Sequence, residues 1–184
     1  MITAEELKSV IYEYQMTEIT EADDDIGNDA IQSAVSEVRG YFIAANNRRE
    51  TANLTKQQYR AWVMYDVDAL FSATIETTTT TDEDSGETTT ETTDYRNPFV
   101  CRLIKRVAVW NLVELSAPDV ILDKVKERYE ATIQTLEKIA GMGDYAQNRL
   151  IVYDAPMLVP TDDEEEELSA PMRMVSRQKF THEF

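Results

Sequence analysis

The sequence predicts a mainly α-helical protein, a small antiparallel bundle of about four helices with an inserted threonine-rich β-hairpin and an extended C-terminal tail. Apolar residues recur at spacings of three and four along most of residues 1–143, the period of helices packed on a core. Half of residues 74–95 are threonine, around a central turn sequence. Residues 144–184 hold three of the five prolines and an acidic run, so we expect a partner-binding tail outside the core.

The first helix is predicted from its N-terminal signal. Thr3 and Glu6 have the spacing of a capping box, in which each side chain binds the other residue's backbone N–H. The apolar residues that follow share one helical face; they are Leu7, Val10, Ile11 and Tyr14. We interpret the acidic segment 17–29 as a link to the next helix.

Within this link, residues 23–25 and Gly27 resemble part of a calcium loop, but the alternating ligand spacing and the closing glutamate are missing. Acidic residues that stabilise a helix N-terminus are the simpler interpretation. The second helix is expected to start near Asn28 or Asp29 and to end around Asn46 and Asn47. Its apolar stripe is Ile31, Ala34, Val35, Val38, Tyr41, Phe42 and Ala45.

Residues 55–75 allow two interpretations. A short helix capped by Thr55 suits the first part. From Tyr65 to Ile75 every odd-numbered residue is apolar, which is the period of a strand. A helical spacing competes with it, in Val63, Val67, Leu70 and Phe71. We expect the short helix to give way to an extended segment that runs into the threonines.

The threonine segment predicts a β-hairpin arm inserted at residues 73–95. Threonine is β-branched and favours extended backbone, and Asp84, Ser85 and Gly86 suit a turn between strands around 73–81 and 88–95. Both faces carry the same side chain, so the arm cannot set its own register. We therefore expect neighbouring copies to pair with it, through Thr77, Thr78, Thr79, Thr80, Thr88, Thr89 and Thr90.

The third and fourth helices form a predicted antiparallel pair. Asn97 and Pro98 suit the N-cap and first position of the third helix, which should break at Ser116 and Pro118. The fourth helix should end at Gly141. Its apolar positions are Leu122, Val125, Tyr129, Ile133, Leu136 and Ala140.

The tail, residues 144–184, begins with a strand candidate at 149–153. We expect it to dock in extended form on a portal or adjoining ring, with the strand adding to a sheet. The expected docking residues are Arg149, Leu150, Ile151, Val152, Tyr153, Met172, Met174 and Phe180.

The net charge of −17 is concentrated in three segments. Residues 18–29 hold six acids, residues 74–95 seven, and residues 161–184 seven acids with three bases. Removing these 20 acids and three bases from the totals of 35 and 18 leaves 15 of each. The body is therefore neutral, which argues against wrapping nucleic acid. A surface that DNA passes without sticking remains compatible.

No pattern for chemistry is evident. Phosphate-binding glycine loops, metal-ligand spacings and nucleophile motifs are missing from the sequence, so we expect no catalytic, cofactor-binding or metal-binding residue. Cys101 is expected to be a small core residue, and His182 a surface residue. One basic cluster stands out, in Arg96, Arg102, Lys105 and Arg106. It is either a solvated helix face or an interface for an acidic partner, such as an acidic segment of a neighbouring copy.

The order of these elements resembles phage head-completion (head–tail connector or adaptor) proteins, in particular the Mu-like Gp36 group of Bacteroidetes phages. The similar pieces are "AIQSAVSEVRGYF", "YDVDALFSA", "RNPFVCRLIKRVAVWNLVEL" and "VKERYEATIQTLEKIAGMG". They cover most of residues 1–143, the expected connector domain. The threonine insertion and the acidic tail depart from that group's pattern.

The resemblance implies a structural virion protein without enzymatic activity. Such proteins form a homo-oligomeric ring, commonly of twelve copies, below the portal. They bind the portal protein and an adjoining neck or tail ring, and DNA passes through the channel without specific binding. The expected location is the virion neck, after assembly in the host cytoplasm; the sequence contains no signal peptide or membrane-spanning run. The alternative is a cytoplasmic acidic helical adaptor or regulator. A DNA mimic fits less well, because the acids do not lie on a predicted rigid helix face.

Overall fold

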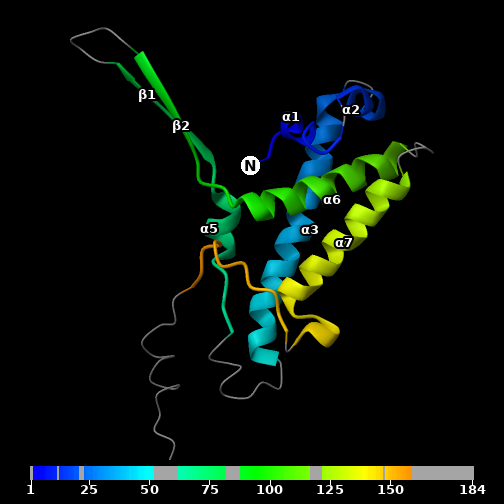
Figure 1. Ribbon diagram of the computed structural model, residues 1–184, viewed down its shortest axis with the longest axis vertical. Helices are drawn as coiled ribbons and strands as arrows, with labels where there is room; N and C mark the ends of the chain where they lie inside the picture. The colour runs from blue at the N-terminus through cyan, green and yellow to red at the C-terminus, as the bar shows by residue number, and fades with distance from the viewer. Residues whose placement is uncertain are drawn as a thin grey trace, which may run out of the picture.

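The computed structural model describes residues 2–11, 13–20, 23–51, 62–81, 88–116, 122–146 and 148–158. Its helices pack together, and one two-stranded antiparallel hairpin extends from them, as the sequence predicts (Figure 1). Residues 159–184, most of the expected tail, lie outside the described residues, as do the predicted turn residues 84–86 and residues 55–61 of the short helix predicted from Thr55. Trp62 and Val63, which that prediction also placed in the helix, are described and are not helical.

Three long helices form the core: α3 (Asp24–Thr51), α6 (Pro98–Ser116) and α7 (Leu122–Ala140). Each packs against the other two, and α7 returns beside α6 (Figure 1). Side chains that are completely buried fill the space between them; they include Val38, Phe42, Val107, Leu112, Val113, Leu136 and Ile139. Burial of the facing apolar sides of α3, α6 and α7 therefore provides a hydrophobic driving force for folding.

The N-terminal helix is shorter than the sequence suggests. The capping box of Thr3 and Glu6 is confirmed, but α1 (Ala4–Leu7) ends after one turn. The Ser9 hydroxyl donates to the Glu6 carbonyl oxygen at 2.7 Å, and such a bond competes with helix continuation. A second helix, α2 (Glu13–Thr20), occupies part of the predicted acidic link, and Tyr14 on it is 65% exposed, so its prediction as a core-facing residue is wrong.

Helix α3 is longer than predicted at both ends. It starts at Asp24, after Asp23 accepts a hydrogen bond from the Asp25 N–H at 2.9 Å, so these acids cap a helix. It continues past Asn46 because that side chain is used elsewhere. The Asn46 amide donates to the Tyr65 carbonyl and accepts from the Tyr65 N–H, both at 2.9 Å. Asn46, which together with Asn47 suggests a helix end, instead binds the backbone of Tyr65.

The expected extended segment before the hairpin is wrong, because residues 67–72 form helix α5 (Val67–Ser72). Asp66 caps it by accepting a hydrogen bond from the Ala69 N–H at 3.0 Å. Leu70 is buried, and Phe71 packs edge-on against Phe42 with ring centroids 5.8 Å apart. The helical spacing of the apolar residues therefore predicts this segment correctly, and the alternating spacing does not.

The hairpin joins strands β1 (Ile75–Thr81) and β2 (Thr88–Asp94), close to the predicted bounds. Its register pairs Ile75 with Asp94 and Thr81 with Thr88. Seven residues per strand span about 23 Å, and the arm points away from the helices (Figure 1). Residues 75–80 and 88–94 are exposed, so the arm rests on no core of its own.

The predicted ends of α6 and α7 are confirmed. The Asn97 side chain accepts hydrogen bonds from the N–H groups of Phe99 and Val100, both at 3.1 Å, directly before Pro98. At the end of α7, Gly141 has a φ of +66°. The Met142 N–H binds the Glu137 carbonyl at 2.9 Å, which completes a glycine C-cap.

We predict that Gly141→Ala lowers the free energy of unfolding by about 1–2 kcal/mol, because a residue with a Cβ atom disfavours positive φ. The added Cβ would also lie 3.1 Å from the Trp62 ring. Thermal or urea unfolding measures the change. The matched control is Gly40→Ala on α3, where the added Cβ meets nothing within 4 Å. It should stabilise by about 0.5–1 kcal/mol, and equal effects of the two variants would contradict this account.

Candidate functional site

The base of the hairpin is held by one guanidinium, that of Arg96. Its Nη1 and Nη2 donate to the two carboxylate oxygens of Glu6 at 2.9 and 2.8 Å. Its Nε and Nη2 donate to the two oxygens of Asp94 at 2.9 and 2.8 Å. Only 8% of the Arg96 side chain is exposed. We call this set of three residues the Arg96 clamp.

The Arg96 clamp joins three parts of the chain. Glu6 lies in α1, and its second oxygen also accepts the Thr3 N–H at 3.0 Å. Asp94 ends β2 and accepts the Arg96 backbone N–H at 2.9 Å. The next residue, Asn97, caps α6. Two bidentate pairs on one guanidinium fix the arm's direction relative to α1 and α6.

The clamp shifts the ionisation of its members. The Arg96 hydrogen bonds lower the pKa of Asp94 to about 2. The hydrogen bond from Arg96 also lowers the pKa of Glu6, although partial burial opposes this change. The hydrogen bonds to Asp94 and then to Glu6 raise the pKa of Arg96 above its usual value. All three groups therefore stay charged across the physiological range.

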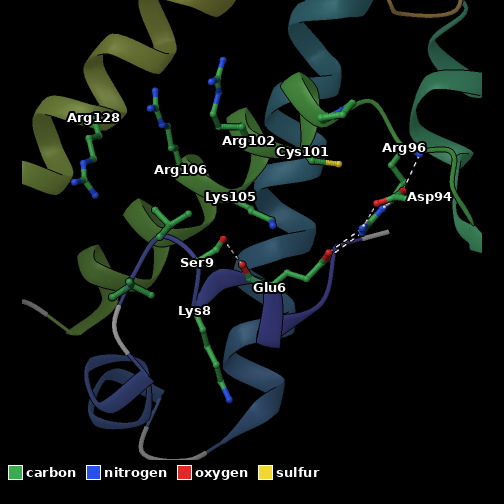
Figure 2. Close-up of a pocket in the computed structure, with 13 residues that line it drawn as sticks. Glu6, Lys8, Ser9, Asp94, Arg96, Cys101, Arg102, Lys105, Arg106 and Arg128 are labelled. Carbon is green, nitrogen blue, oxygen red and sulfur yellow. Dashed lines mark hydrogen bonds and ion pairs between the residues drawn. The ribbon is translucent and has the colours of Figure 1, made fainter. Parts of the chain in front are cut away.

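Beside the clamp lies a groove of about 750 Å³ between α1 and the segment after it, α6, and α7 (Figure 2). Six of its lining residues are cationic: Lys8, Arg96, Arg102, Lys105, Arg106 and Arg128. Its two carboxylates, Glu6 and Asp94, are both paired with Arg96. We call this site the basic groove. Its lining carries six positive charges against two negative ones, on a chain of net charge −17.

Four of these cations have no carboxylate partner within 4.0 Å in the part of the chain that the structure describes: Arg102, Lys105, Arg106 and Arg128. Arg102 and Arg106 lie one turn apart on α6, and Arg128 comes from α7 (Figure 2). The Arg102 guanidinium rests over the Phe99 ring at 5.2 Å. These side chains are therefore free to pair with an anionic group from outside the body.

An apolar pocket of about 280 Å³ adjoins the basic groove. Its apolar lining residues include Ile2, Leu70, Phe71, Val100 and Ile104. Arg96 and Cys101 line both sites, so these two residues form a wall between them. Cys101 is half-buried and has no disulfide partner, and burial raises the pKa of its thiol.

The predicted basic cluster is thus divided by the structure. Arg96 lies in the internal clamp, whereas Arg102, Lys105 and Arg106 line the open groove. Sequence reasoning missed Lys8 and Arg128, which come from segments far apart in the chain. No local signal in the sequence identifies them, because only the packing of α1 and α7 on α6 brings them together.

The predicted hairpin-arm residues lie where the sequence places them. Thr77, Thr78, Thr79 and Thr80 are exposed on β1, and Thr88, Thr89 and Thr90 are exposed on β2. Four of the pairs across the hairpin join threonine to threonine.

The predicted strand at 149–153 is wrong, because the structure assigns no strand there. Arg149 lies against the body instead. Its guanidinium donates to the carbonyls of Ile139 and Val63 at 2.8 Å and lies 4.6 Å over the Trp62 ring. These hydrogen bonds hold the segment against the end of α7 and against Val63, and the segment pairs with no strand.

Among the predicted docking residues, Val152 is also buried, and its N–H donates to the Tyr65 hydroxyl at 3.1 Å. Leu150 and Tyr153 are exposed, by 39% and 78%, and Ile151 is half-buried. Met172, Met174 and Phe180 lie outside the described residues. Arg149 and Val152 are therefore engaged by their own chain, and the exposed Leu150 and Tyr153 are open to a partner.

Comparison with family models, with curated proteins and with solved structures gives no match, so the function is argued from the residues. In the described ranges, no three His, Cys, Asp or Glu side chains are grouped in a way that could hold a metal ion. None of the helices described has the length and apolar character needed to cross a membrane.

We predict that Arg96→Met lowers the free energy of unfolding by about 1–3 kcal/mol, because it leaves two carboxylates without their charged hydrogen-bond donor. Chemical denaturation measures the change. The control is Arg39→Met, which removes the exposed pair with Asp68 and should cost less than about 1 kcal/mol. An Arg96 variant as stable as the Arg39 variant would contradict the role assigned to the clamp.

We also predict that stability falls on acidification between about pH 4 and pH 2. Asp94 has a folded pKa of about 2, below its ordinary value of 3.8. Its contribution is therefore complete above pH 4 and is lost as pH falls through the folded pKa. Thermal unfolding across this range should show a shallower pH dependence for Asp94→Asn than for the wild type. Identical slopes would contradict the linkage.

Proposed function

We propose that this protein is a structural subunit of a phage virion, which forms a homo-oligomeric ring below the portal, joins head to tail and leaves a channel for DNA. The observation that carries the proposal is the hairpin arm on its ion-paired base. An exposed two-stranded sheet without a core is marginal in water, and each of its edges presents unpaired backbone groups. Pairing with neighbouring copies satisfies both edges.

The arm's composition supports association between identical chains. Threonine faces threonine at Thr77 and Thr92, at Thr79 and Thr90, at Thr80 and Thr89, and at Thr81 and Thr88. The same threonine ladder on a neighbouring arm offers matching β-branched surfaces. Ring symmetry requires such heterologous contacts, in which one edge of each copy meets the other edge of the next.

A second feature supports a contact at the foot of the arm. A depression of about 370 Å³ is lined by the exposed residues Tyr95 and Tyr153, which are 61% and 78% exposed. Tyrosine is enriched in protein interfaces because it adds large contact area and a hydroxyl at low entropic cost. The arm and its foot thus form one continuous surface for a neighbour.

The charge distribution supports passage of DNA. The arm carries carboxylates and no cation: residues 74–95 hold seven acids. If arms line the channel, these carboxylates repel phosphates and prevent the DNA from sticking. The similarity of the helical segments to phage head-completion proteins agrees with this role.

A deletion tests the proposal. Removal of residues 75–93, which joins Thr74 to Asp94 and so keeps the Arg96 clamp, should weaken ring assembly or tail attachment while leaving the helical body folded, because the arm contributes no core residue. Native mass spectrometry and circular dichroism measure the two properties. Replacing the threonines of both strands by serine is a milder variant, because serine favours strands less, and should weaken assembly without deleting the arm.

The contrary result is equally clear. A deleted chain that assembles as the full chain does, and supports normal tail attachment, would overturn the proposed role of the arm. A folded monomer that binds and regulates another protein would favour the interpretation as an acidic adaptor instead.

A further inference from the structure

We infer that the basic groove, with its adjoining apolar pocket, binds the acidic C-terminal segment of a neighbouring copy of this chain, residues 162–168. The inference rests on the proposed self-assembly and names the contact that locks one copy to the next. The segment reads Asp-Asp-Glu-Glu-Glu-Glu-Leu, six carboxylates followed directly by an apolar side chain. These residues lie outside the described part of the chain.

The first reason is charge complementarity. Arg102, Lys105, Arg106 and Arg128 line the groove, with no carboxylate partner in the described residues. On a chain with 35 acids and 18 bases, a concentration of unpaired cations beside one open groove requires explanation. Charged groups that complement each other across an interface provide specificity and orientation.

The second reason is the order of the two sites. The carboxylates of the segment precede Leu168, and the apolar pocket lies on the other side of the wall that Arg96 and Cys101 form beside the basic groove. The pocket offers Val100, Ile104 and Phe71 to a leucine side chain. A segment that lies along the groove with its carboxylates on the cations therefore brings its leucine to the side where the apolar pocket lies.

The same order favours a neighbouring copy over the chain's own tail. The described chain ends at Leu158, whose N–H donates to the Met64 carbonyl at 2.9 Å. Leu70 lines both the apolar pocket and the depression beside Tyr153 and Pro156. Residues 153–156 of the same copy thus lie beside the apolar pocket and do not line the groove, so the tail of a neighbouring copy is the simpler occupant of the groove.

The close-up shows how the charged side chains of the groove are directed. Arg102 and Arg106 extend side by side from α6, while the two carboxylates of the groove are turned toward Arg96 (Figure 2). The carboxylates of the clamp are therefore already neutralised and do not repel an incoming acidic segment. The groove keeps a net positive surface for it.

Zero-length carbodiimide cross-linking of the assembled full-length chain tests the contact. We expect Lys105 to be joined to carboxylates of residues 162–167, because Lys105 lines the groove. In an equal mixture of ¹⁴N- and ¹⁵N-labelled chains, half of these cross-links should join a light to a heavy copy. High salt should suppress them, because it screens exposed charges. Cross-links within single copies alone would overturn the inference.

A charge exchange tests it independently. A chain with Arg102→Glu and Arg106→Glu, and a second chain with Glu164→Lys and Glu165→Lys, should each associate more than about tenfold more weakly than the wild type. An equal mixture of the two should recover association, because the reversed tail of one fits the reversed groove of the other. The control is Lys124→Glu with Lys126→Glu, which makes the same charge change on residues of α7 that do not line the groove. It should assemble normally.

The outcomes separate the two proposals. A wild-type chain that never assembles would overturn both the ring and the docking site. Normal assembly by the groove-reversed chain would overturn the docking site and leave the ring intact. If association recovers only when the groove and tail reversals are in one chain, and not in the mixture, the tail binds its own groove. That result would overturn the inferred contact between copies. If the groove-reversed chain assembles normally but loses retention of a short duplex DNA, the groove is a nucleic-acid site and the inference is overturned.

Discussion

One guanidinium, that of Arg96, ties the hairpin arm to the helical body. It holds a carboxylate of α1 on one side and a carboxylate at the end of β2 on the other, and the next residue caps α6. The helical core would form from its buried apolar faces without this contact. The direction of the hairpin, and the wall that the basic groove and the apolar pocket share, depend on it. The surfaces proposed for assembly are therefore built on a rigid, fully charged centre.

The charge of the chain is divided by position. Acidic residues gather in the arm and the C-terminal segment, whereas four cations that have no carboxylate partner among the described residues line one groove of the helical body. In the proposed ring, each copy would present its acidic segment to the basic groove of the next, and the arms would meet edge to edge. The acidic segments would then attach one copy to the next, and the carboxylates of the arms would repel DNA phosphates.

The sequence predicts those features that depend on local signals. The capping box at Thr3, the proline that opens α6, the glycine that ends α7 and the two threonine strands each need only neighbouring residues. The sequence predictions are wrong where contacts between distant segments determine the local structure. Asn46 clamps Tyr65 and does not end α3, and Arg149 binds carbonyls of two other segments and does not extend a strand. Half of the basic groove is visible as a cluster in α6, but Lys8 and Arg128 join it only through packing.

We propose that identical copies of this chain associate into a closed ring. Electron microscopy of the purified full-length chain across a concentration series tests this association. We expect closed rings of a single stoichiometry near twelve copies, with threonine arms in contact between neighbours and density for an acidic segment in each basic groove. Monomers at every concentration, alone and beside portal and tail components, would contradict it.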